Sequence, residues 1–103
     1  MRVIVSDDAM LRIRLTAIYI RKEFGRSSRD RFMQDVRQLR KLLADNPHLG
    51  HVEPLLAHLP QMYRSIVFGR LNKLVYLIHD DVIEIVDLWD VRRDPAALAA
   101  GVG

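Results

Sequence analysis

Two consecutive stretches with apolar residues at helical spacing constrain the fold of this chain more than any other feature of its sequence. Each stretch repeats an apolar residue every three or four positions, so each predicts a helix with one apolar face. The stripes comprise Met10, Ile13, Ala17, Ile20 and Phe24 in the first stretch and Phe32, Val36, Leu39 and Leu43 in the second. Leu11, Leu15 and Ile18 widen the first stripe, and Gly25 is expected to end that helix. The sequence therefore predicts a helical hairpin.

Polar residues mark the expected ends of both helices. Residues 6–8 read Ser-Asp-Asp, which can cap the first helix and complement its dipole. Residues 2–5 before them are mostly β-branched and predict a short strand. Ser27 or Ser28 is expected to cap the second helix, and the Asn-Pro pair at 46–47 to end it.

Three strand-like runs follow the helices, at residues 63–68, 74–79 and 82–89. The connections between them are short, which predicts an antiparallel meander. The apolar faces of the helices need a surface, and one face of this sheet provides it. We therefore predict an α+β fold of order βααβββ, in which a helical hairpin packs on a four-stranded, antiparallel-rich sheet. Ile13, Ala17, Val36 and Leu39 are expected to face the sheet.

The chain has 103 residues, of which 50% are hydrophobic, and this suffices for one packed domain. We assign that domain to residues 1–95 and expect the Ala/Gly-rich residues 96–103 to form a flexible tail. Residues 48–61 combine prolines with apolar residues and are expected to form an ordered loop packed on the body.

Composition limits the class of protein. Without cysteine the chain forms neither disulfides nor thiolate metal sites, and charged residues interrupt every apolar run near the N-terminus, so we expect a cytoplasmic protein with no membrane partner. The net charge is +3, but residues 1–50 hold eleven basic and six acidic residues, whereas the remainder holds five and seven. The basic half is compatible with a nucleic acid, a ribosome or an acidic protein as partner.

Together with this order of elements, three segments resemble the RelE/ParE superfamily of toxins from type II toxin–antitoxin systems. They are Tyr-Arg-Ser-Ile-Val at 63–67, Lys-Leu-Val-Tyr at 73–76 and Asp-Leu-Trp-Asp-Val-Arg-Arg-Asp-Pro at 87–95. The resemblance implies a toxin that arrests growth and a hetero-oligomer with a cognate antitoxin protein. RelE-like members cut messenger RNA on the ribosome, whereas ParE-like members poison DNA gyrase, so the resemblance leaves two targets open.

The resemblance also implies candidate catalytic residues. The strand arginine of the family corresponds to Arg64 and its C-terminal arginine to Arg92 or Arg93, whose planar guanidinium groups suit phosphate. Lys73 on the adjoining strand is a further candidate cation, and His79 is a candidate general base because histidine is the residue type that exchanges a proton near neutral pH. On these residues we favour a ribosome-dependent endoribonuclease.

Two departures keep other functions open. RelE-type nucleases typically have lysines just before the second strand and a tyrosine after the last one, whereas residues 51–62 contain no lysine and the final tyrosine is Tyr76. The alternatives are a ParE-like gyrase inhibitor and a degenerate module that retains only antitoxin binding.

Each candidate also has a structural interpretation. Arg92 and Arg93 can pair with Asp90 and Asp94, and such surface pairs contribute only about 0–1 kcal/mol. The tyrosines and Trp89 are assigned to packing first. The helix cations are most simply a solvated face, or alternatively a landing surface for ribosomal RNA or an acidic antitoxin. The four histidines lack diagnostic ligand spacing, so we expect no metal or cofactor. These histidines are His48, His51, His58 and His79.

Overall fold

The computed structural model describes residues 1–102. The elements in chain order are β1 (Arg2–Val5), α1 (Asp7–Phe24), α2 (Arg26–Asp45), β2 (His51–Val52), the 3-10 helix η1 (Pro54–Leu56), β3 (Tyr63–Phe68), β4 (Asn72–His79), β5 (Val82–Asp90) and α3 (Pro95–Ala100). None of the helices in the described part of the chain combines the length and hydropathy that a membrane crossing requires.

The strands form one sheet in the order β1-β5-β4-β3-β2. β1 runs parallel to β5, and every other pair is antiparallel. The helical hairpin carries the chain from β1 at one edge of the sheet to β2 at the other edge. The predicted α+β fold is confirmed, with one strand more than expected. That strand, β2, has only two residues and lies within the predicted loop, too short for alternation to reveal.

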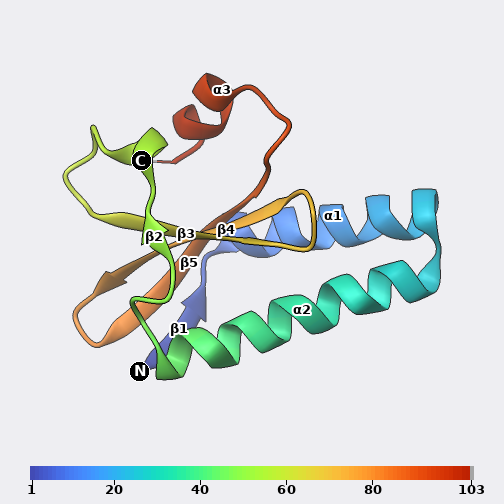
Figure 1. Cartoon of the computed structure of the whole chain (residues 1–103), viewed down its shortest axis with the longest axis horizontal. Coiled ribbons are helices and arrows are strands. Elements are labelled where there is room, and N and C mark those ends of the chain that lie inside the picture. Colours follow the sequence, from blue (N-terminus) through green and yellow to red (C-terminus); the bar gives the residue numbers. More distant parts are fainter. Residues whose placement is uncertain (103) are drawn as a thin grey trace.

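Figure 1 shows α1 and α2 on one side of the sheet and α3 with η1 on the other. Between the hairpin and the sheet lies the larger apolar cluster, in which Ile13, Val36 and Leu39 are buried and against which Ala17 packs. The predicted helix faces are therefore confirmed. Buried apolar side chains of β4 and β5 complete this cluster, namely Leu74, Tyr76, Ile83, Ile85 and Leu88.

A second, smaller apolar cluster lies on the opposite face of the sheet. It consists of Leu56, Tyr63, Val75, Leu77, Trp89 and Leu98. Since the centre of the sheet is covered on both faces, the aromatic residues Tyr63, Tyr76 and Trp89 are all buried as packing residues. They are not available to stack on the bases of a nucleic acid.

The turn between the two helices differs from the expectation. Ser6 caps α1 by accepting a hydrogen bond from the backbone N–H of Ala9, as predicted. Gly25, however, both ends α1 and serves as the N-cap of α2, with no side-chain cap. Its φ of 94° lets the chain reverse within one residue, so α2 already begins at Arg26 and the expected cap at Ser27 or Ser28 does not form.

The C-terminal segment also differs from the expected flexible tail. Asp94 accepts a hydrogen bond from the backbone N–H of Ala96, and residues 95–100 form helix α3. Leu98 is buried in the second cluster, so an apolar contact holds this short alanine-rich helix in place. The last residue of the expected tail, residue 103, lies outside the described residues.

Candidate functional site

The first two candidate catalytic residues lie on opposite faces of the sheet. In the antiparallel ladder Arg64 is paired with Tyr76, on the face that the hairpin covers. Lys73 is paired with Trp89, on the face that α3 and η1 cover. Because paired residues share a face and successive residues alternate, Arg64 and Lys73 project in opposite directions and do not form one phosphate site.

Arg64 holds the segment between α2 and β2 against the sheet. Its Nη1 donates to the carbonyl oxygen of Gly50 at 2.7 Å. The buried hydroxyl of Tyr76 accepts from the backbone N–H of Gly50 at 2.9 Å and donates to the carbonyl oxygen of Pro47 at 2.9 Å. Burial raises the pKa of Tyr76, which keeps the hydroxyl protonated and able to donate. Arg64 therefore has a structural partner in the backbone.

Lys73 is engaged by a buried carboxylate that sequence reasoning did not single out as buried. Its Nζ lies 2.7 Å from Oε1 of Glu53, a side chain only 1% exposed. Glu53 also accepts from the hydroxyl of Ser65 and the backbone N–H of Leu55, both at 2.8 Å. Burial alone would raise the pKa of Glu53, but the hydrogen bonds from Lys73, Leu55 and Ser65 together hold it below its usual value. Lys73 is therefore part of this hydrogen-bond network. Its Nζ also lies 5.7 Å from the centre of the Trp89 ring, in a cation–π contact.

The remaining candidates lie at opposite ends of β4 and β5. His79 ends β4, where its Nε2 is 3.1 Å from Oε1 of Glu84. Arg92 follows the other end of β5, where it forms a two-point contact with Asp90 at 2.7 and 3.1 Å. The length of β4, eight residues, separates these ends by about 25 Å at roughly 3.3 Å per residue. His79 is thus too far from Arg92 to act on the same phosphate.

Arg92 and Arg93 instead line a groove between α1, the β3–β4 turn and the end of β5. The groove has a volume of about 750 Å³ and is lined mainly by apolar side chains with arginines at its sides. Its apolar lining comprises Leu15, Tyr19, Ile20, Phe24, Leu71 and Leu88. Its four arginines are Arg12, Arg70, Arg92 and Arg93. We call this the α1 groove.

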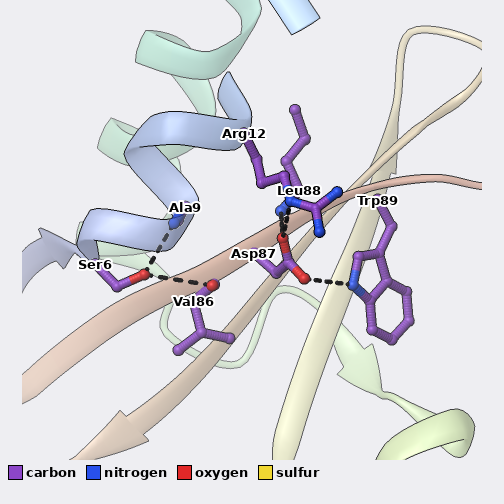
Figure 2. Close-up of polar contacts among 7 residues, drawn as sticks. All are labelled: Ser6, Ala9, Arg12, Val86, Asp87, Leu88 and Trp89. Carbon is purple, nitrogen blue, oxygen red and sulfur yellow. Dashed lines mark hydrogen bonds and ion pairs between the residues drawn. The ribbon is translucent and has the colours of Figure 1, made fainter. Parts of the chain in front are cut away.

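Two buried hydrogen bonds hold the Asp87 carboxylate next to Arg12, one of the arginines of the α1 groove. Figure 2 shows the carboxylate of Asp87 between Arg12 and the indole of Trp89. Asp87 is buried and accepts from the indole N–H of Trp89 at 2.9 Å and from the backbone N–H of Leu88 at 2.8 Å. The Nε of Arg12 lies 4.0 Å from Asp87, a long contact that leaves the exposed guanidinium free to meet a partner.

The outer face of α1 remains apolar and uncovered beside this groove. Leu11, Leu15, Ile18 and Tyr19 on this face are all at least half exposed. Phe24 belongs to the apolar stripe that was expected to face the sheet, yet at the C-terminal end of α1 it is 66% exposed. An exposed apolar face of this size next to charged groups is typical of a surface that binds another protein. The sequence indicated this exposed face through Leu11, Leu15 and Ile18, because they make the apolar surface of the first helix broader than one face of a sheet can cover.

Arg12 and Arg70 were missed as groove residues because only the tertiary packing brings the start of α1 and the β3–β4 turn to Arg92 and Arg93. Of these four arginines, Arg92 is paired with Asp90, and the hydrogen bond from Arg92 lowers the pKa of Asp90.

Among residues 1–102, no cluster of three histidine, cysteine, aspartate or glutamate side chains has the geometry to hold a metal ion.

Comparisons with known proteins agree with this architecture. Residues 3–95 match the family model described as the ParE toxin of the type II toxin–antitoxin system parDE. A solved structure described as the chromosomal ParDE toxin–antitoxin system from P. aeruginosa is similar in fold, with a TM-score of 0.72 at 16% identity over 88% of this chain and 96% of that one. A comparison with curated protein sequences finds no match.

Proposed function

Because the chain belongs to the ParE toxin family of type II toxin–antitoxin systems, we propose that it arrests growth by inhibiting DNA gyrase and that a cognate antitoxin silences it by occupying the α1 groove. The observation that carries the choice of target is the separation of the candidate catalytic side chains. Arg64 and Lys73 project from opposite faces of the sheet, and each is held by a structural partner.

Phosphate cleavage requires cations, a proton acceptor and a proton donor within reach of the same phosphate. Of the five candidate catalytic residues, all within the described part of the chain, only Arg92 and Arg93 lie together, and His79 is about 25 Å from them at roughly 3.3 Å per strand residue. In the sequence, Arg64 favours ribosome-dependent cleavage of messenger RNA. That activity is therefore the second candidate function. An inhibitor that acts by binding needs no such convergence.

The α1 groove suits an antitoxin segment of definite chemistry. Its apolar lining would take apolar side chains, and its arginines would pair with carboxylates at the edges. We therefore expect an amphipathic, acidic segment that lies along α1 and covers its exposed apolar face. Such a complex would be a hetero-oligomer, in which the arginines of the groove select acidic partners.

The target is tested by two assays on the same purified protein. We expect it to block supercoiling of relaxed plasmid by gyrase, with relief on addition of antitoxin, and to leave messenger RNA intact on programmed ribosomes. Cleaved messenger with normal supercoiling would reverse the choice of target. Normal results in both assays, together with antitoxin binding and normal growth on expression, would leave only the degenerate antitoxin-binding module.

A further inference from the structure

A second charged surface lies outside the α1 groove, along α2. At 100° per residue, five cations of α2 fall within a sector of about 120° around the helix axis, beside the buried face. They are Arg26, Arg29, Arg37, Arg40 and Lys41. Asp30 is the one acidic residue in this sector, whereas Asp35 and Asp45 lie on other sides of the helix. We call these five cations, with Arg2 of β1, the α2 basic stripe.

Arg2 joins the stripe because β1 lies next to the C-terminal half of α2. Nη2 of Arg40 donates to the carbonyl oxygen of Val3 at 3.2 Å, which fixes that guanidinium beside the strand. Arg2, Arg37, Arg40 and Lys41 line one shallow groove of about 430 Å³. Four exposed cations thus lie around a single depression between α2 and β1.

Most of these charges have no counterion among the residues that the structure describes. Arg29 is paired with Asp30 at 2.8 Å. In the described part of the chain, no ion pair involves Arg2, Arg37 or Lys41. Like charges this close repel one another, so an external polyanion would relieve the repulsion.

The composition of the stripe favours a nucleic acid over a protein partner. A protein interface has an apolar, charge-depleted core, whereas a nucleic-acid interface is more polar and strongly positive. Within the described residues of α2, Leu42 is the only large apolar side chain that is exposed, and it lies on the side away from the stripe. The exposed apolar residues of the hairpin are concentrated on α1 instead.

The dimensions of the stripe suit duplex DNA. From Arg26 to Lys41 the stripe runs about 22 Å along α2 at 1.5 Å per residue, which corresponds to roughly six or seven base pairs. Cations spaced along this length can reach several phosphates of one backbone. The exposed face of α2 has no aromatic side chain on which the unpaired bases of a single-stranded nucleic acid could stack.

We propose that the α2 basic stripe binds the phosphate backbone of double-stranded DNA without sequence preference. The inference goes beyond the proposed function, since it concerns DNA and is measured without gyrase or antitoxin. For four or five phosphate contacts, we expect a plot of the logarithm of the binding constant against the logarithm of salt concentration to have a slope of about −4. Raising salt fourfold should therefore weaken binding by a few hundredfold.

The test measures fluorescence anisotropy of a labelled 30-base-pair duplex of arbitrary sequence with the full chain. The charge-reversal variant R37E/K41E removes two stripe cations, and R31E/R70E makes the same change in net charge at exposed positions outside the stripe. We expect R37E/K41E to lose at least tenfold in affinity and R31E/R70E to lose less than threefold. Melting temperatures check that both variants fold, and R37Q/K41Q replaces R37E/K41E if that variant does not.

Four outcomes would overturn the proposal. Equal losses in the two variants would show that net charge alone drives binding. A wild-type affinity that is independent of salt would exclude backbone contacts. Displacement of the duplex by polyglutamate at a charge concentration equal to that of competitor DNA would show that the stripe is a site for an acidic polypeptide. Failure of DNA binding with gyrase still inhibited would refute this inference and leave the proposed function intact.

Discussion

Replacing Lys73 by alanine distinguishes a structural lysine from a catalytic one. The substitution leaves the carboxylate of Glu53, which is 1% exposed, without the one cation that pairs with it among residues 1–102. Removing one member of a buried ion pair typically costs about 3–5 kcal/mol. Because the Lys73 side chain is itself 22% exposed, solvent screens part of this interaction, and we expect a loss of roughly 2–3 kcal/mol in the free energy of unfolding.

The pH dependence of stability should also reverse its sign. In the wild type the folded-state pKa of Glu53 is lowered, so its contribution to stability is present above the unfolded pKa and is lost as pH falls through the folded value. In Lys73→Ala, burial becomes the dominant influence and raises that pKa. The folded variant then binds the proton more tightly than the unfolded chain, and its stability should increase as pH falls from neutrality towards the unfolded pKa.

The assay is urea denaturation at several pH values, with Lys41→Ala as the control, since Lys41 is an exposed lysine without an ion pair among the described residues. Glu53→Gln combined with Lys73→Met removes both charges and should recover most of the lost stability. A change below about 0.5 kcal/mol in Lys73→Ala, with unchanged pH dependence, would refute the structural role of this lysine.

Two further substitutions test the packing. Leu39→Ala should cost roughly 2–5 kcal/mol in urea denaturation because Leu39 is buried between α2 and the sheet; a cost near 0.5 kcal/mol would place the helix face elsewhere. Gly50→Ala should lower the melting temperature, with a cost of about 1–3 kcal/mol, since a Cβ would lie 2.7 Å from the carbonyl oxygen of Ser65 and 2.9 Å from the Tyr76 ring. An unchanged melting temperature would show that this segment is not held as described.

Periodicity was sufficient to predict the main body of the fold. The buried positions Ile13, Val36 and Leu39 follow from spacing alone, because a stripe on a surface helix has to face the core. The meander follows from short connections between β-branched runs. The short elements β2 and α3 could not be predicted, since neither contains enough residues to show a period and both depend on tertiary contacts.

The candidate site was harder to predict because it depends on strand register. A shift of one residue in the pairing of β3 with β4 moves every side chain to the other face, and only the folded sheet shows Arg64 opposite Tyr76 and Lys73 opposite Val67. The burial of Glu53 was equally hidden, since a lone acidic residue in a proline-bearing loop is usually exposed. The motif residues therefore identified the family better than they identified a site.

The affinity for the cognate antitoxin tests the importance of the α1 groove most directly. Leu15→Glu places a carboxylate in the apolar lining, whereas Leu42→Glu makes the same change at an exposed leucine of α2 outside the groove. If the antitoxin occupies the α1 groove, isothermal titration calorimetry should show a loss of about 30-fold or more for Leu15→Glu, the scale of a central interface residue, and less than threefold for Leu42→Glu. Wild-type affinity in Leu15→Glu, with the variant shown to be folded, would contradict the account.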